Sequence, residues 1–121
     1  MGGVKIDVAD KAFSLYIRTR DNWTCQKCGA DHHIKRSSLH CSHFMGRGKE
    51  ATRFDPANAD AICYPCHVRF GAHPQEHMAW QIERKGQDVV DRLIAQSNTY
   101  KKKDRKLEVI IWRERLKEFD E

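Results

Sequence analysis

The sequence predicts a small α+β protein whose fold is held together by a bound metal ion. Two Cys-x-x-Cys pairs, at 25–28 and 63–66, have the spacing at which one loop supplies two thiolates to a tetrahedral zinc. Short mixed segments between the pairs are typical of strands, and segments outside them repeat apolar residues at helical spacing. With 121 residues the chain is one domain with a limited core, so a structural metal is a plausible source of stability.

Helices are predicted on both sides of the cysteine-rich region. Residues 10–20 place Phe13, Tyr16 and Ile17 three and four positions apart, with Asp10 as a helix cap. Further helical patterns cover residues 74–85, 88–94 and 104–119. The last segment has the broadest apolar face, which requires burial against the domain or against another chain.

The middle of the chain favours two strands followed by a helix. Residues 37–44 and 59–63 are short and mixed enough to be strands, and turn-forming residues separate them. Pro65 is compatible with a cysteine loop that opens into a helix, because proline is tolerated in the first helical turn. We therefore divide the chain into a zinc-bound core with its N-terminal helix, residues 1–78, and a C-terminal helical extension, residues 79–121.

The charge balance narrows the class of partner. The net charge of +5 and the pI near 9.0 suit a polyanion, although many basic proteins bind no nucleic acid. No apolar run approaches the roughly 20 residues needed to cross a bilayer, and the first residues lack the apolar segment of a signal peptide. We therefore expect a cytoplasmic protein without a membrane partner.

The cysteines are best explained by zinc. Five cysteines in a reducing compartment argue against a disulfide framework, and Cys25, Cys28, Cys63 and Cys66 complete one four-sulfur site, leaving Cys41 over. Residues 63–67 also fit a haem-attachment pattern. Haem attachment would require export and would leave the first cysteine pair unexplained.

The order of the remaining polar residues resembles a known nuclease superfamily. Cys41-Ser42-His43-Phe44 is followed by Asn58 and by His67, which comes directly after the last cysteine. This order is similar to the HNH, or ββα-metal, endonucleases, in which a hairpin and a helix hold one divalent cation. Together with residues 52–54 and 86–91, it looks most like the NinG (Rap) recombination endonucleases of lambdoid phages.

The resemblance implies a role for each matching residue. By position His43 corresponds to the general base, Asn58 to the residue that steadies the hairpin, and His67 to the metal ligand on the helix. These roles suit phosphodiester hydrolysis, which needs a base for water and a cation near the phosphate. Histidine titrates near neutrality and can take the proton. The alternatives are that His67 is a surface imidazole and that His43 is a spare zinc ligand.

One position departs from the superfamily pattern. HNH sites usually carry Asp or His directly before the base, whereas this chain has Ser42. His40 is the first candidate for the missing ligand; the other candidates are His73, His77, Asp55 and Asp60. The resemblance implies Mg²⁺ or Mn²⁺ as the catalytic cation, while ligands rich in imidazole also suit Zn²⁺ or Ni²⁺.

Several basic residues are candidates for phosphate contacts. Arg47, Lys49 and Arg53 lie between the expected base and the second cysteine pair. Arg18 and Arg20 on the first helix are as compatible with a solvated helix end as with DNA. Residues 101–106 form a denser basic cluster that could hold the backbone without sequence selectivity.

The leading hypothesis is a metal-dependent DNA endonuclease of HNH type that acts on branched DNA, such as Holliday junctions, in phage recombination. It would work in the cytoplasm of the bacterial host, and as a dimer through the last helix. A zinc-stabilised nucleic-acid-binding module without catalysis is the first alternative. A general nicking HNH enzyme is the second, since it shares the chemistry and differs in substrate.

Overall fold

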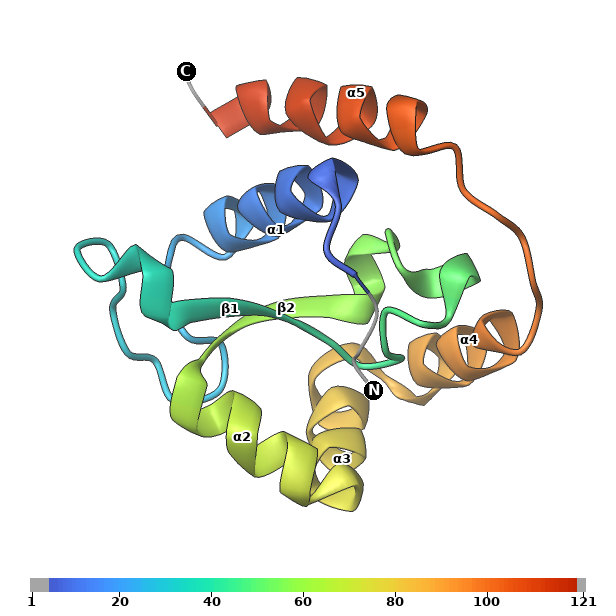
Figure 1. Ribbon diagram of the computed structural model, residues 1–121. Helices are drawn as coiled ribbons and strands as arrows, with labels where there is room; N and C mark the ends of the chain where they lie inside the picture. Colours follow the sequence, from blue (N-terminus) through green and yellow to red (C-terminus); the bar gives the residue numbers. More distant parts are fainter. Residues whose placement is uncertain (1–4, 120–121) are drawn as a thin grey trace.

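A computed structural model describes residues 5–119, and it shows a two-stranded hairpin between helical layers (Figure 1). The elements in chain order are α1 (Val8–Arg20), β1 (Leu39–His43), β2 (Ala59–Cys63), α2 (Tyr64–Ala72), α3 (Pro74–Lys85), α4 (Gln87–Ser97) and α5 (Arg105–Leu116). Helix α1 covers one face of the hairpin and α5 lies on the outer side of α1, while α2 and α3 cover the other face. The α+β prediction is confirmed at this level. None of the described helices is long and apolar enough to span a bilayer.

Helix α1 begins two residues earlier than its apolar pattern indicated. Asp7 is the N-cap, and its carboxylate accepts a hydrogen bond from the Asp10 backbone N–H at 3.0 Å. Asp10 accepts from the Asp7 backbone N–H at 2.9 Å, which completes a capping box. The expected cap at Asp10 is therefore corrected to Asp7, and Asp10 occupies the third helical position. The buried face of the helix carries Phe13 and Ile17.

The hairpin is antiparallel, and His43 pairs with Ala59 at one end while Leu39 pairs with Cys63 at the other. Side chains alternate across a strand, so Cys41 and His43 face α1 and Ser42 faces α2. The predicted strand at 37–44 is shorter in the structure, because residues 36–38 form a 3₁₀ turn. The predicted strand at 59–63 and the helix opening at Tyr64-Pro65 are confirmed.

The C-terminal helix packs back onto the N-terminal one. The Trp112 ring lies 4.8 Å from the Phe13 ring and 5.1 Å from the Tyr16 ring, measured between centroids. This contact buries one stripe of α5, whereas Leu107 and Ile110 remain exposed. The boundary expected between residues 78 and 79 falls inside α3, and the extension is braced against the core.

Replacing Trp112 with alanine should therefore destabilise the protein. Loss of a buried aromatic side chain costs about 3–5 kcal/mol, and here it also detaches α5 from α1. Chemical denaturation followed by circular dichroism measures the change. Ile110→Ala on the exposed side of the same helix is the matched control and should change the free energy of unfolding by less than about 1 kcal/mol. Equal losses in both variants would contradict this packing.

Candidate active site

The two cysteine pairs meet at one point, as the sequence predicted. The sulfur atoms of Cys25, Cys28, Cys63 and Cys66 all lie within 4.8 Å of one another. A tetrahedral zinc with bonds of about 2.3 Å separates its sulfur ligands by roughly 3.8 Å, and the Cys28 and Cys63 sulfurs are 3.7 Å apart. The donor set and spacing therefore fit a structural zinc ion. The cluster joins the loop after α1 to the start of α2.

The acidity of these thiols also favours a bound cation. Burial and the neighbouring Cys63 sulfur raise the pKa of Cys66 well above its ordinary value. Burial would also raise the pKa of Cys25, but backbone N–H groups, first that of Cys28, outweigh it and lower that pKa to about 7. Four thiolates so close together repel one another, and a divalent metal ion compensates their charge.

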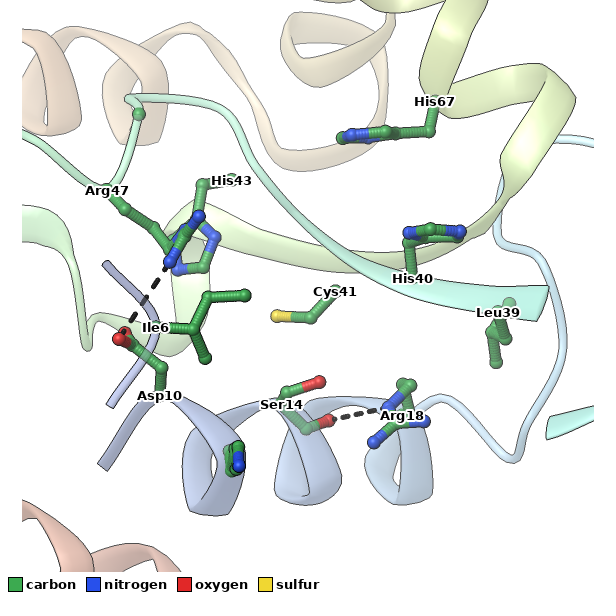
Figure 2. A pocket seen from close by; sticks show the side chains of 12 residues that line it. Ile6, Asp10, Ser14, Arg18, Leu39, His40, Cys41, His43, Arg47 and His67 are labelled. Atoms are coloured by element: carbon green, nitrogen blue, oxygen red, sulfur yellow. Dashed lines mark hydrogen bonds and ion pairs between the residues drawn. The ribbon is translucent and has the colours of Figure 1, made fainter. Parts of the chain in front are cut away.

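A groove of about 570 Å³ runs along the free edge of β1 (Figure 2). The three histidines that the resemblance brought forward, His40, His43 and His67, all line it. Its other wall is helix α1, which contributes Arg18 and Lys11. Because the described sheet has two strands, no third strand covers this edge. Strand β1 and helix α2 thus present histidines to one basic groove.

The ring of His43 is held in a single orientation. Its Nε2 lies 2.9 Å from the carbonyl oxygen of Arg53, and a carbonyl can only accept, so Nε2 carries the proton. Nδ1 is then the basic nitrogen. Burial lowers the pKa of His43 to about 4, against the opposing effect of the hydrogen bond to Arg53. The imidazole is therefore neutral at pH 7 and able to accept a proton.

His67 and His40 lie together on the α2 side of the hairpin. His67 Nδ1 is 3.3 Å from the hydroxyl oxygen of Ser42, and the His67 and His40 rings stack with centroids 5.4 Å apart. Burial lowers the pKa of both rings, and the neighbouring Arg18 contributes for His40. Two neutral imidazoles and one hydroxyl are thus available near one point. These are nitrogen and oxygen donors of the kind that a divalent cation could use, although the two rings stack face to face in this structure.

The other candidate ligands lie elsewhere. His77 is buried in the core, stacked on Phe70 at 4.3 Å, and its pKa is lowered to about 4 by burial. Asp60 is buried beside Lys85 at 2.9 Å, and Asp55 pairs with Arg92 at 3.0 Å. His73 is exposed at the junction of α2 and α3, outside the groove. Within residues 5–119 the four cysteines are the one group of three or more close metal-binding side chains.

Asn58 fixes the loop that follows β1. Its side-chain oxygen accepts from the Met45 backbone N–H at 2.8 Å. Its amide nitrogen donates to the carbonyls of Met45 and Thr52. The side chain is fully buried, so these bonds are shielded from water. Asn58 thus ties this loop to the start of β2, and the role that the resemblance implied for it stays a prediction.

The three expected phosphate contacts differ in the structure. Arg47 lines the groove, and its buried Nη1 has no hydrogen-bond partner, with the nearest Asp10 oxygen at 3.9 Å. Lys49 is exposed beyond the groove. Arg53 requires a correction, because its guanidinium is buried and donates to both oxygens of Asp10. Arg53 is therefore occupied inside the protein and unavailable to DNA.

The sequence did not predict that α1 forms one wall of this groove. Arg18 lies on the groove wall, whereas Arg20 is committed to the carbonyls of Pro56 and Ala59 at 2.8 and 2.9 Å. Adjacent basic residues look alike in a sequence. The one available signal was helical spacing, which puts Lys11 and Arg18 seven positions apart and so on one face.

The fold and the site define a class of protein, a small α+β protein with a four-cysteine metal-binding site and a basic groove lined by histidines. A family model described as the bacteriophage lambda NinG protein matches residues 4–120. The chain therefore belongs to the NinG family, and the expected relation to that phage family is confirmed. Comparisons with curated proteins and with solved structures gave no match.

Removing one sulfur from the cluster should release its metal. Cys63→Ser should reduce bound zinc from about one ion per chain to less than a tenth of that, and should lower the melting temperature, because binding of a structural zinc contributes to folding. Metal analysis after gel filtration measures this. Cys41→Ala, whose sulfur lies outside the cluster, should retain zinc. Full retention by Cys63→Ser would refute the ligand set.

The lowered pKa of His43 has a consequence for stability. Above pH 6.5 the ring is neutral in both folded and unfolded chains. Below pH 6.5 the ring binds a proton in the unfolded chain but stays neutral in the folded chain. From pH 7 to pH 5 the free energy of unfolding should fall by about 2 kcal/mol on account of this ring. His43→Gln should remove that part of the pH dependence. An NMR titration that places the His43 pKa near 6.5 would contradict it.

Proposed function

We propose that this protein is a metal-dependent DNA endonuclease of HNH type that serves phage recombination. The observation that carries the proposal is the His43 ring, whose Nε2 is anchored on a backbone carbonyl while the ring lines a basic groove. That arrangement leaves Nδ1 as a neutral base at pH 7. Membership of a phage family and the order of His43, Asn58 and His67 both support this function.

In the proposed mechanism, His43 Nδ1 takes a proton from the water that attacks the phosphorus. The resulting imidazolium is disfavoured by burial in the free groove, but a bound phosphate places negative charge beside it and raises its pKa. Substrate binding thus strengthens the base when it is needed. Arg47 and Lys11 hold the phosphate oxygens, and the unpartnered Nη1 of Arg47 gains an acceptor.

His67 and His40 would hold the catalytic cation. When bound, a divalent ion supplies positive charge to the phosphate and to the departing 3′ oxygen. The Ser42 hydroxyl accounts for the departure from the superfamily pattern, because it stands beside His67 where an acidic or imidazole ligand is usual. A serine is a weak metal ligand, so His40 would contribute more to the coordination of the cation.

Branched DNA is the proposed substrate, and a dimer is the proposed active form. Paired cuts across a Holliday junction require two active sites. The exposed apolar side chains of Leu107 and Ile110 on α5 could join two copies. None of the described elements presents a recognition helix for base sequence, which is consistent with selection by DNA shape.

A second function is a zinc-stabilised nucleic-acid-binding module without catalysis. It is favoured because, within residues 5–119, the four cysteines are the one close group of three or more metal-binding side chains. It is also favoured by the low basicity of His43. This alternative gives no reason for the anchored ring or for three histidines in one groove.

Cleavage assays separate the two functions. The purified protein is incubated with supercoiled plasmid or with a synthetic four-way junction, with and without Mg²⁺ or Mn²⁺. His43→Ala should lose cleavage by about 10²–10⁴-fold, the usual contribution of a general base, and should keep its affinity for the junction. His73→Ala removes an exposed histidine outside the groove and should cut at the wild-type rate.

The pattern of results decides between the proposals. Junction binding without cleavage by any variant, in either metal, would support the binding module. Equal rates for wild type and His43→Ala would refute the assigned base. Equal cutting of junction and linear duplex would favour the general nicking enzyme.

A further inference from the structure

One apolar side chain lies where burial does not explain it. Ile34 is 96% exposed, more than any other large hydrophobic residue that the structure describes. It belongs to the segment between Cys28 and β1, which extends to one side of the molecule (Figure 1). Single exposed apolar residues are common on protein surfaces, so exposure alone assigns no role.

Several hydrogen bonds link the segment around Ile34 to itself and to Trp23. The His32 backbone N–H donates to the Trp23 carbonyl at 2.7 Å, and the His32 ring lies 2.9 Å from the Ser38 hydroxyl. Ser38 in turn donates to the Lys35 carbonyl at 2.8 Å. The root of the segment is the first cysteine pair, which the metal cluster fixes. The isoleucine is therefore presented to water by a hydrogen-bonded loop and does not pack onto the core.

Basic residues adjoin this apolar tip in the sequence, and the same segment carries one exposed carboxylate, Asp31, which pairs with His33. Lys35 and Arg36 follow Ile34 directly. The Arg36 guanidinium lies 4.2 Å from the centre of the Trp23 ring, and the Arg18 guanidinium lies 4.8 Å from that same ring. Arg18 also lines the groove. The basic surface of the groove thus continues to the base of the loop.

We propose that Ile34 is a wedge that inserts between unstacked bases of the DNA, next to a branch point. Isoleucine is among the apolar residues that nucleic-acid-binding proteins place between base steps, with cations nearby to hold the backbone. Ile34 precedes His40 by six residues, which span at most about 21 Å. With stacked bases about 3.4 Å apart, the inserted side chain would lie within roughly six steps of the proposed catalytic groove.

This inference rests on the proposed DNA-binding function and adds the origin of its structure selectivity. Unstacking a paired duplex step costs free energy, whereas a branch point offers bases that are already partly unstacked. An apolar wedge on this hydrogen-bonded loop therefore favours branched DNA over linear duplex. The phosphate contacts of Lys35 and Arg36 act equally on both DNA forms.

The test measures binding without added divalent cation, so that cleavage does not interfere. A four-way junction and a linear duplex of the same sequence carry 2-aminopurine, the junction at its branch point. Wild type should raise the fluorescence of the junction and bind it more tightly than the duplex. Ile34→Ser should bind the junction about tenfold more weakly, without the fluorescence rise, because burying an isoleucine side chain contributes a factor of at least that order. Its affinity for the duplex should not change.

Two further variants complete the comparison. Ile34→Leu keeps an apolar side chain and should retain both signals. Met78→Ser, at an exposed apolar position on α3, should behave as wild type. Circular dichroism and zinc content verify that each variant is folded.

The outcomes separate the wedge from the endonuclease. Wild-type behaviour of Ile34→Ser, equal losses on junction and duplex, or no binding of DNA by wild type would each overturn the wedge. If Ile34→Ser binds both DNA forms as wild type does and the protein still cuts plasmid, the wedge is refuted and the endonuclease is retained. If Ile34→Ser loses only junction binding and the protein does not cut DNA under any condition, the wedge is retained and the endonuclease is refuted.

Discussion

The orientation of the His43 imidazole depends on the position of one backbone carbonyl, that of Arg53. The Arg53 side chain holds this carbonyl in place through its buried ion pair with Asp10 on α1. Burial alone would raise the pKa of Asp10, but the hydrogen bonds from Arg53 and from the Asp7 backbone, together with the nearby arginine charges, lower it and keep the carboxyl ionised. Breaking such a pair leaves an uncompensated buried charge, which is strongly destabilising. The chemistry of the groove is thus tied to a contact between residues far apart in the sequence.

Helix α1 connects the hairpin, the groove and the C-terminal helix α5. Its inner face packs against the hairpin, its outer face receives Trp112 from α5, and its side chains form one wall of the groove. Arg105, at the start of α5, donates to Asp7, the cap of α1, at 2.8 Å, and also pairs with Glu50. The C-terminal extension therefore braces the helix against which the site is built. The basic cluster at residues 101–106 is partly used in this brace.

The sequence predicted those parts of the site that depend on local spacing. Two cysteines three residues apart can supply two zinc ligands from local spacing alone, and Pro65 marks the start of α2. The buried role of Arg53 was not predictable, because its partner Asp10 precedes it by 43 residues. Ser42 was noted as a departure, but its contact with His67 requires the register of β1 against β2. The exposed position of Ile34 was likewise invisible, since apolar residues are expected inside.

The cysteine cluster has a further consequence for how the protein reaches its native state. It closes the chain between Cys28 and Cys63, a segment that contains the whole groove side of the hairpin. Before an ion binds, Cys28 and Cys63 must come together, and closing this long loop costs conformational entropy. A bound zinc ion would offset this cost, so chains kept free of metal would form the groove more slowly.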